Sequence, residues 1–447
     1  MYFNVKTFGC KVNQYESIGI STAMRKAGFE ETCDEKTADI IIINSCSVTG
    51  ASDKKACHEI ARLKKLNPAT VVILAGCFPQ AFPAEAEKSD ADIVTGNASK
   101  DSIPHILQKY LSDRKKIVDF APLPTSYEGI ELCRQGEKTR AFIKIEDGCN
   151  RFCSYCIIPY ARGRVRSRSI DDIVSEVSDC VRSGQKEIVL VGINLSCYGS
   201  DTGKNLADAV EAVCAVDGVE RVRLSSLEPE LLDEVMLDRL SSLKKLCPHF
   251  HLSLQSGSDG TLKRMNRHYT ADEYYKIVCN IRRRFPDAAI TTDIMVGFAD
   301  ETNEEFAESC AFAEKVGFAK IHVFSYSVRE GTAAAKRTDH IPENVKNERY
   351  KILSDIDNRL HNDFLAAQVG TEQEILIEKR KSPDYVNGYT KNYTPVRIYG
   401  ADIPRHSIVR VRITGAENGY CTGFFKCIRS DLPGQRNSDD YCGFCSC

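Results

Sequence analysis

The sequence predicts an α/β protein with an N-terminal parallel sheet domain, a central partial barrel of six strand–helix repeats and a small C-terminal β-barrel. Three observations predict this class. Short β-branched runs alternate with helical stretches between residues 3 and 325, which is typical of parallel sheets covered by helices. A segment rich in turn residues, 121–136, interrupts the alternation. Beyond residue 372, short strands follow one another with Gly-containing turns between them.

The N-terminal and central parts contain ten runs that we expect to be strands. In the N-terminal part they lie at 3–7, 38–44, 70–75 and 91–94, with helices near 17–27, 52–66 and 83–89. In the central part they lie at 141–145, 187–192, 219–225, 250–254, 289–296 and 321–325, with helices at 170–182, 271–284 and 303–316. Six repeats in about 190 residues predict an open barrel, because a closed eightfold barrel takes about 250 residues.

The C-terminal part, from residue 342 on, is expected to contain one helix and a small group of strands. A charged helix is expected over 342–368, and strands are expected at 375–378, 395–398 and 408–413. The expected divisions are therefore an N-terminal domain at 1–123, a barrel domain at 137–368, a small β module at 370–430 and a Cys-rich tail at 431–447. The tail cysteines, Cys442, Cys445 and Cys447, are left outside the candidate site.

Composition and charge exclude several classes of protein. The chain has 447 residues, enough for about three domains, and its net charge of -2 excludes a uniformly basic nucleic-acid binder. The first residues show no basic leader before an apolar stretch, and no apolar run approaches the roughly 18 residues of a membrane span. We therefore expect a cytoplasmic protein without membrane contact. Its 20 cysteines then favour metal binding or redox chemistry over disulfide bonds.

Three cysteines share one loop directly after the first expected strand of the barrel. Cys149, Cys153 and Cys156 have the spacing C-x3-C-x2-C, and no histidine lies near them in the sequence. A structural zinc normally takes four protein ligands, whereas a four-iron cluster held by three thiolates keeps one iron free. The motif resembles that of the radical S-adenosylmethionine (SAM) superfamily, which implies that the free iron binds SAM. The alternative is a zinc knuckle that takes its fourth ligand from elsewhere.

Three further cysteines follow the first three strands of the N-terminal part. Cys10, Cys46 and Cys77 each lie one to three residues beyond a run expected to be a strand. The carboxyl ends of parallel strands meet at one edge of a sheet, so these thiols are expected to converge. We therefore predict a second cluster site. The alternative is that each is a buried, small apolar residue.

Four segments carry a more specific resemblance. GCKVNQYES around Cys10, NSCSVT around Cys46, AGCFPQ around Cys77 and GCNRFCSYCIIPYARGRVRSR from 148 on together resemble the methylthiotransferases. The similarity extends to about residue 430 and is greatest to the branch that acts on N6-threonylcarbamoyladenosine in tRNA. It implies an auxiliary 4Fe-4S cluster on Cys10, Cys46 and Cys77, a radical SAM 4Fe-4S cluster on the loop cysteines, and a C-terminal TRAM module that binds RNA.

The resemblance also implies a reaction. A methylthio group is placed on C2 of the modified adenosine at position 37, next to the anticodon, using two SAM molecules and a low-potential electron donor. A radical is needed because the aromatic C–H bond is inert to acid–base chemistry, and the cofactor carries it. A monomer acting on tRNA is expected. Within the same chemistry the alternatives are N6-isopentenyladenosine or a ribosomal protein side chain as substrate; from another class, the alternative is a zinc-dependent RNA-binding protein without turnover.

Polar residues near the ends of the barrel strands are candidates for SAM binding. Side chains at this end of a barrel line the active site. The alternative is ordinary capping of loops. The candidates are Tyr155, between two cysteines of the loop, and Ser225, Glu228, Gln255, Arg267 and Asp293.

Two basic stretches are candidates for binding RNA. One follows the cysteine loop, and the other lies in the C-terminal module, where residues 372–429 contain ten Lys/Arg and six Asp/Glu. Arginine binds phosphate well, and aromatic rings stack on bases. The alternative for the module is a small β-barrel with surface charge. The candidates are Arg162, Arg164, Arg166 and Arg168 in the first stretch, and Tyr389, Lys391, Tyr393 and Arg397 in the second.

Overall fold

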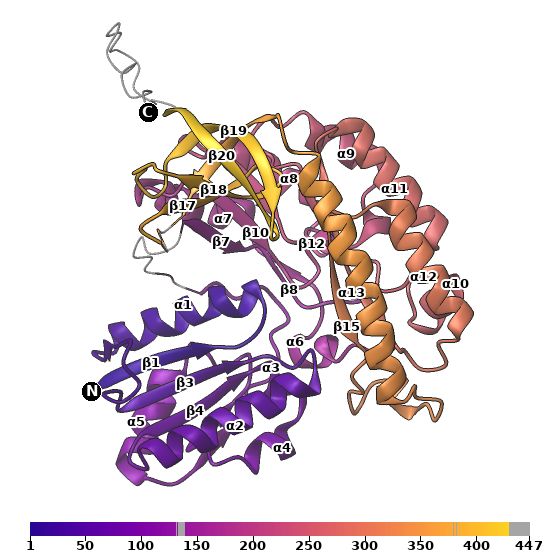
Figure 1. Cartoon of the computed structure of the whole chain (residues 1–447). Coiled ribbons are helices and arrows are strands. Elements are labelled where there is room, and N and C mark those ends of the chain that lie inside the picture. The colour runs from indigo at the N-terminus through magenta and orange to yellow at the C-terminus, as the bar shows by residue number, and fades with distance from the viewer. Residues whose placement is uncertain (131, 133–138, 379, 381, 429–447) are drawn as a thin grey trace, which may run out of the picture.

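The computed structural model describes residues 1–130, 132, 139–378, 380 and 382–428, and it has the predicted α/β architecture (Figure 1). A parallel sheet domain, an open barrel and a closed β-barrel meet around a common centre. The Cys-rich tail lies outside the described residues, as do 131 and 133–136 of the stretch that links the first two parts. Within the described chain, no helix is both long and apolar enough to cross a membrane.

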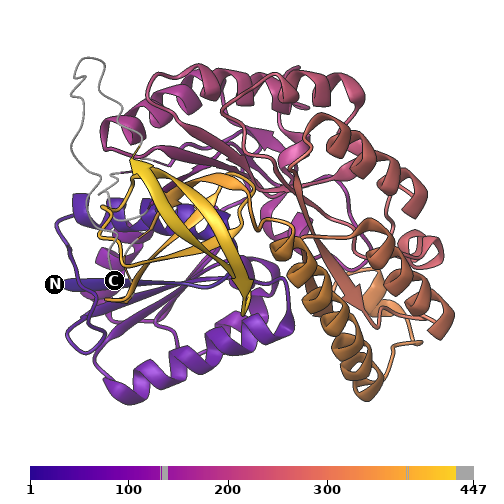
Figure 2. The same cartoon turned by 45° about the horizontal axis from the view of Figure 1, so that its top comes forward.

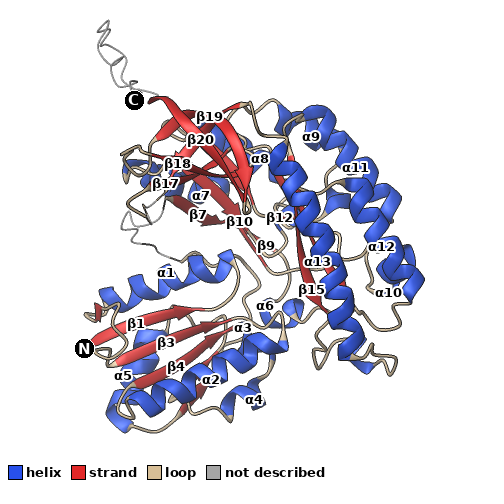
Figure 3. Ribbon diagram, viewed as in Figure 1, coloured by secondary structure: helices blue, strands red, loops and turns tan. Residues whose placement is uncertain are grey.

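The N-terminal sheet is parallel throughout and has the strand order β2-β1-β3-β4-β5-β6 (Figure 3). Its central strands are apolar on both sides, because helices cover both faces. Two helices, α1 and α5, pack on one face, and α2, α3 and α4 pack on the other. The strands are β1 (Tyr2–Thr7), β2 (Glu30–Glu31), β3 (Ile40–Ser45), β4 (Val71–Gly76), β5 (Ile93–Thr95) and β6 (Ile117–Asp119); the helices are α1 (Lys11–Lys26), α2 (Gly50–Leu66), α3 (Cys77–Ala81), α4 (Pro83–Glu87) and α5 (Ile103–Asp113).

Helix α1 begins six residues before the predicted start at residue 17. Its N-cap is Cys10, whose side chain makes no capping hydrogen bond, and its first turn has no acidic residue. Since neither usual signal of a helix start is present, the sequence pattern placed the start too late. This earlier start matters for function, because Cys10 then lies directly at the N-terminus of a helix that contacts the barrel.

The central barrel is open, as predicted. Its strands form two parallel sheets, β11-β10-β7 and β12-β13-β14-β15, which a bridge between Val222 and Leu246 connects. The outer helices follow the arc of strands (Figure 2). The main strands are β7 (Arg140–Lys144), β10 (Glu187–Val191), β11 (Arg221–Leu224), β13 (His249–Leu252), β14 (Ala289–Val296) and β15 (Lys320–Ser325), with a two-residue β12 (Ser226–Leu227); β8 (Glu146–Asp147) and β9 (Arg166–Ser167) pair beside the cysteine loop.

Helices fill the intervals between the barrel strands. Helices α7, α11 and α12 were predicted, whereas the two short helices α8 and α9 were not. The apolar sides of these helices pack on alternate residues of the strands, which leaves the other strand residues facing the lumen. The helices are α6 (Ile158–Arg162), α7 (Ile170–Arg182), α8 (Leu206–Ala215), α9 (Glu234–Ser241), α10 (Asp259–Arg264), α11 (Ala271–Arg284), α12 (Asn303–Val316) and α13 (Glu343–Ala366).

Helix α1 contacts the lumen side of the first barrel strands. Val12 packs with Val189 and Val191 of β10 and with Phe142 of β7. The N-terminal domain thus covers part of the open barrel and brings the edge of its own sheet to the barrel lumen.

The C-terminal module is a closed barrel with the strand order β16-β17-β18-β20-β19. Two of its strands, β17 and β20, were not predicted. Each contains a glycine, Gly388 and Gly423, which weakens a strand pattern. Both glycines lie where a side chain would meet the backbone of the neighbouring strand. The strands are β16 (Glu372–Ile377), β17 (Tyr385–Thr390), β18 (Pro395–Tyr399), β19 (Ile408–Glu417) and β20 (Tyr420–Ile428).

Candidate active site between two cysteine trios

Cys10, Cys46 and Cys77, here called the N-terminal trio, lie together at the carboxyl edge of the N-terminal sheet. Cys46 and Cys77 directly follow β3 and β4, which pair in register up to Ser45 and Gly76. The thiolates of the trio interact electrostatically, since Cys10 and Cys77 both raise the pKa of Cys46. The predicted convergence is therefore present in the structure.

Glycine makes this close approach possible at two points. Gly9 and Gly76 precede Cys10 and Cys77, and their φ angles are +109° and +104°. A side chain at Gly9 would come within 2.5 Å of the Cys46 Cβ atom, and one at Gly76 within 2.5 Å of the Ser45 carbonyl oxygen. Only glycine combines this backbone conformation with this contact.

Burial raises the pKa of two thiols in the N-terminal trio, those of Cys46 and Cys10. It is the largest cause of the rise to about 12 for Cys46, and the Cys77 thiolate adds to it. Burial also raises the pKa of Cys10, against the effect of the Arg162 guanidinium. These thiols hold their protons at neutral pH, and binding of a metal group must release them.

Cys149, Cys153 and Cys156, here called the loop trio, follow β7 and β8 at the carboxyl end of the barrel. The Cys156 amide donates to the Cys153 carbonyl at 2.9 Å, and Gly148 has a φ of +85° in contact with the Arg164 carbonyl. Burial, followed by the Cys153 thiolate, raises the pKa of Cys156 to about 12. The loop folds its three thiols toward one another.

Each trio receives a hydrogen bond from a buried arginine. Arg162 Nε donates to Cys77 Sγ at 3.3 Å, and Arg267 Nη1 donates to Cys153 Sγ at the same distance. Such N–H donors favour sulfur that carries negative charge, and they tune the potential of an iron–sulfur cluster. Both donor sets therefore fit a cluster bound by three thiolates.

The spacing of the sulfur atoms is too wide for a zinc ion. Sulfurs around a tetrahedral zinc lie about 3.8 Å apart, because the Zn–S bond is about 2.3 Å. Of the His, Cys, Asp and Glu side chains that the structure describes, one group of three has all its ligand atoms within 4.8 Å of one another, and it contains none of the six cysteines. The geometry thus disfavours the zinc alternative at either trio.

One cavity of about 160 Å³ lies between the loop trio and the segment that follows Cys46 of the N-terminal trio. On the N-terminal side it is lined by Val48 and Thr49, which follow Cys46, and on the barrel side by Cys156. We call it the central cavity. Three of the six residues predicted to bind SAM also line it: Tyr155, Gln255 and Asp293.

The other three residues predicted to bind SAM are not among those that line the central cavity. Arg267 forms an ion pair with Glu228 and donates to Cys153, so both side chains lie beside the loop trio. Ser225 is buried, and its hydroxyl has no hydrogen-bond partner in the described chain. Gln255, at the end of β13, has a φ of +71°, a strained conformation of the kind that occurs at functional sites.

A buried ionic network connects the two domains next to the N-terminal trio. Arg162 of α6 donates to Glu16 of α1 at 2.8 Å and to Asp147 of β8 at 3.1 Å. Lys144 and Lys100 also pair with Glu16. The prediction that Arg162 binds RNA is corrected, because its side chain is 1% exposed and held by these acids.

The other arginines of the first basic stretch differ in their exposure. Arg166 is buried and donates to the carbonyls of Arg162 and Arg164, so the expectation of RNA binding is corrected for it too. Arg168 is half-buried and pairs with Glu176. Arg164 is exposed, with its guanidinium 4.5 Å from the Phe152 ring centroid. Burial was not visible in the sequence, since the four arginines alternate with small or apolar residues, although Arg162 ends α6 and Arg166 begins β9.

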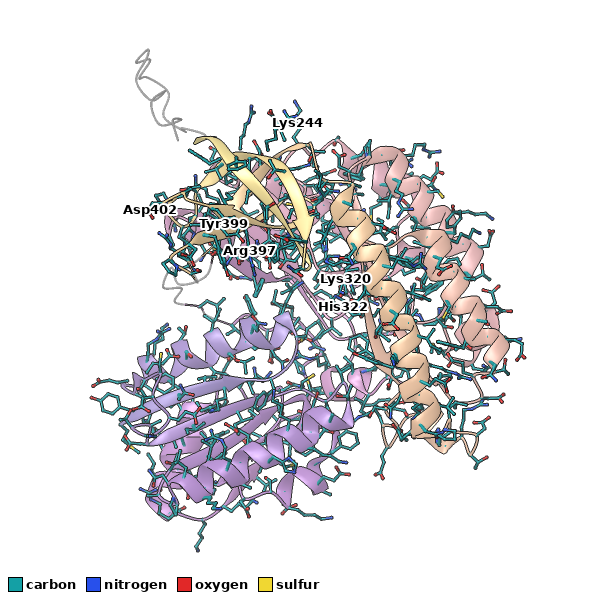
Figure 4. All side chains as sticks on the ribbon, viewed as in Figure 1. Lys244, Lys320, His322, Arg397, Tyr399 and Asp402 are labelled. Carbon is teal, nitrogen blue, oxygen red and sulfur yellow. The ribbon has the colours of Figure 1, made fainter. Side chains whose placement is uncertain are left out.

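The aromatic residues of the C-terminal module fall into two groups. Tyr389 and Tyr393 stack at 4.6 Å between ring centroids, and Arg140 of the barrel lies over both rings. Lys391 accepts a hydrogen bond from Arg223 through its carbonyl. These three residues thus dock the module on the barrel. Arg397 lies farther along the same face of β17 and β18, next to Tyr385 and Tyr399. Figure 4 shows Arg397 and Tyr399 on this part of the module.

Several lumen residues were missed from the sequence. Lys11 directly follows Cys10 and interacts electrostatically with Arg223 and Asp293. His251 and His322 lie on β13 and β15 on either side of Asp293. One signal in the sequence identifies these positions as lumen-facing. Polar residues alternate with apolar ones from 249 to 255, and alternate residues of a strand point to opposite faces; the polar ones are His249, His251, Ser253 and Gln255.

Comparison with known proteins agrees with this geometry. Residues 143–313 match the Radical SAM superfamily, residues 2–96 match the uncharacterized protein family UPF0004, and residues 366–425 match the TRAM domain. Among solved structures, the radical SAM methyltransferase TsrM from Kitasatospora setae has a TM-score of 0.55 at 13% identity, covering 75% of this chain and 77% of TsrM. Fold and site thus define a radical SAM protein with an added N-terminal sheet domain and a TRAM module.

Relatives that match along nearly the full length narrow this class. The threonylcarbamoyladenosine tRNA methylthiotransferase MtaB of Bacillus subtilis is 36% identical over 95% of this chain and 96% of its own. The tRNA-2-methylthio-N(6)-dimethylallyladenosine synthase of Caldicellulosiruptor saccharolyticus is 34% identical over 94% and 92%. The chain belongs to the radical SAM methylthiotransferase family. Membership implies SAM and one 4Fe-4S cluster as cofactors.

Proposed function

We propose that the protein is a tRNA methylthiotransferase that inserts a methylthio group at C2 of N6-threonylcarbamoyladenosine at position 37. The observation that carries the proposal is the position of the central cavity, which is lined by Cys156 of the loop trio on one side and by Val48 and Thr49, just beyond Cys46 of the N-terminal trio, on the other. An adenine ring in this cavity lies against the loop trio on one side and against the segment that follows Cys46 on the other. The similarity to methylthiotransferases named for this nucleoside supports the choice of substrate.

Within this proposal the N-terminal trio binds an auxiliary 4Fe-4S cluster, and the loop trio binds the radical SAM cluster. The two clusters and two SAM molecules supply the sulfur, the methyl group and the radical. The side chains hold these groups in place: Arg162 and Arg267 donate to one cysteine of each trio, and Tyr155, Gln255 and Asp293 line the pocket for SAM and substrate. Val48 and Thr49 close the cavity on the other side.

The polarity of the lumen supports threonylcarbamoyladenosine over isopentenyladenosine. The threonylcarbamoyl group carries a carboxylate, whereas the isopentenyl group is a hydrocarbon. The Lys11 ammonium, next to Cys10, takes part in no hydrogen bond or ion pair of the described chain. A cation beside the lumen that forms no ion pair favours a carboxylate over a hydrocarbon, because a hydrogen bond to a charged group contributes about 1.5–3 kcal/mol.

The remaining partners follow from the substrate. We propose that tRNA contacts the exposed Arg164 beside the cysteine loop and the TRAM strand face with Arg397, Tyr385 and Tyr399. Aromatic rings and arginine on one face suit unstacked bases and phosphates. The protein then works as a cytoplasmic monomer that receives electrons from a low-potential donor.

Nucleoside mass spectrometry of tRNA tests the proposal. Deleting the gene is expected to abolish the methylthio form of N6-threonylcarbamoyladenosine and leave the unmethylthiolated nucleoside, and a plasmid copy should restore it. Loss of the methylthio form of isopentenyladenosine instead would reassign the substrate. An unchanged tRNA nucleoside profile would contradict a role in tRNA and direct attention to a ribosomal protein side chain.

A further inference from the structure

Three potential metal ligands project into the barrel lumen from three neighbouring strands. His251 lies on β13, Asp293 on β14 and His322 on β15, and the register pairs Asp293 directly with His322. Their ligand atoms all lie within 4.8 Å of one another. This is the one such group among the residues that the structure describes. We call it the lumen triad.

The contacts within the lumen triad are too long to be strong hydrogen bonds. The distance from His251 Nε2 to Asp293 Oδ2 is 3.4 Å, whereas a charge-assisted hydrogen bond spans about 2.7–2.9 Å. The rings of His251 and His322 have their centroids 5.7 Å apart and are tilted by 43°. The three groups therefore converge on a common point without satisfying one another directly.

A second observation comes from the other nitrogen of His251. Its Nδ1 lies 3.0 Å from the hydroxyl oxygen of Thr291, the residue of β14 that pairs directly with His251. A histidine that binds a metal through one ring nitrogen almost always has its other nitrogen held by an oxygen in this way, which fixes the ring and directs the free nitrogen. Here the contact leaves Nε2 facing Asp293.

The surroundings leave one side of the lumen triad open. Asp293 also lines the central cavity, and the His322 side chain is exposed. Figure 4 shows His322 with Lys320 near the centre of the molecule, at the open side of the barrel. Lys320 is paired with Asp357 of α13, so its charge is balanced by an acid. Lys11 of α1 also interacts electrostatically with Asp293.

We propose that His251, Asp293 and His322 bind a divalent transition-metal ion of the Zn²⁺ or Fe²⁺ kind, separate from the two cysteine trios. Two imidazoles and one carboxylate are a donor set that such ions prefer, and three protein ligands leave at least one position for an oxygen ligand from the cavity. The site does not depend on which nucleoside the protein modifies. Its failure would therefore leave the proposed function untouched.

Zinc content measures the site without reference to activity. The holoenzyme, with both cysteine trios loaded with iron and sulfide under anaerobic conditions, is incubated with Zn²⁺ and desalted. Elemental analysis is expected to find about one zinc per chain more in the wild type than in His322→Ala. A matched control is His58→Ala, which removes an exposed histidine on α2 and should retain the zinc. Equal zinc in His322→Ala and wild type would overturn the proposal.

A second variant tests the geometry without removing a ligand. Thr291→Val keeps the size of the side chain but removes the oxygen that holds His251. The dissociation constant for zinc should rise by about 10- to 100-fold, as for other losses of this kind of support. A crystal of the zinc-loaded holoenzyme should show anomalous scattering at the zinc edge beside His251 Nε2 and Asp293. Anomalous signal at cysteine sulfurs alone would overturn the proposal.

Discussion

Lys11 and Arg267 are charged side chains that lie next to the two trios. Lys11 directly follows Cys10 of the N-terminal trio, and Arg267 contacts Cys153 of the loop trio. Arg267 is held by Glu228 and directs an N–H group at Cys153, so it helps to hold the loop trio. Lys11 follows Cys10 and forms no hydrogen bond or ion pair in the described chain, although the Asp293 carboxylate raises its pKa from a distance. A paired cation supports the site, whereas an unpaired one is available for a ligand.

Replacement of Lys11 by methionine keeps the length of the side chain and removes its charge. We expect kcat/KM for tRNA carrying threonylcarbamoyladenosine to fall by about 10- to 100-fold, because a hydrogen bond to a charged group contributes about 1.5–3 kcal/mol. Quantifying the methylthio product by mass spectrometry checks this. Lys54→Met, at an exposed position of α2, is the control. Equal activity of the two variants would remove Lys11 from substrate binding.

Helices α1 and α6 are the elements that bring the trios to one cavity. Glu16 of α1 accepts from Arg162 of α6 and from Lys144 of β7, and all three side chains are buried. Buried charges persist only when they are paired, so this network favours one orientation of the N-terminal domain on the barrel. Helix α1 adds an apolar contact through Val12.

Replacement of Arg162 by methionine should destabilise the contact between the two domains. It leaves Glu16 and Asp147 without their shared guanidinium, and loss of one partner of a buried pair costs about 3–5 kcal/mol. Urea unfolding of the purified chain should show this loss, together with lower iron retention by the N-terminal trio. Arg164→Met removes an exposed arginine from the same loop. If both variants unfold at the same urea concentration, the network does not hold the domains.

The contact between barrel and TRAM module rests on a second buried carboxylate, Glu187. Burial alone would raise its pKa, but Arg223 and Arg140 override this effect and lower the pKa from 4.5 to about 2. A lowered pKa stabilises the folded state above pH 4.5, and this stabilisation is lost as the pH falls from 4.5 toward 2.

Glu187→Gln should therefore lower the free energy of unfolding near neutral pH by about 3–5 kcal/mol, and the difference from the wild type should narrow below pH 4.5. Urea unfolding at several pH values measures this. Glu348→Gln, at an exposed position of α13, should show no such difference. A deficit for Glu187→Gln that widens with acid would contradict the assigned direction of the pKa shift.

Much of the fold was predictable because hydrophobic periodicity reports burial directly. All six main barrel strands and the open form of the barrel were predicted. The start of α1 and the strands β17 and β20 were missed, because Cys10 gives no capping signal and Gly388 and Gly423 interrupt the pattern. Convergence of the N-terminal trio was predictable because the carboxyl ends of parallel strands meet at one edge of a sheet.

The parts of the site that escaped prediction depend on tertiary contacts. Nothing local distinguishes the buried Arg162 from the exposed Arg164, since only the position of Glu16 decides which one is paired. Likewise, the sequence around Tyr389 and Tyr393 is typical of an RNA-binding surface. In the structure both rings contact Arg140 of the barrel instead. The lumen triad combines residues from three strands, which no spacing within the sequence reveals.

At the scale of the whole molecule, two modules border one cavity and the third packs on the barrel. The parallel sheet presents the N-terminal trio, the open barrel presents the loop trio and the lumen residues, and the TRAM module packs on the barrel through Tyr389 and Tyr393. The radical SAM barrel alone has one trio. Its combination with the N-terminal sheet supplies the second trio that methylthio transfer requires in our proposal.

Iron analysis of the anaerobically reconstituted protein tests the central claim most directly. Two clusters predict about eight irons per chain in the wild type. Replacing Cys10, Cys46 and Cys77 by alanine should leave about four irons, and so should replacing Cys149, Cys153 and Cys156. If the first triple variant retained the iron content of the wild type, the N-terminal trio would hold no cluster, and the account would be contradicted.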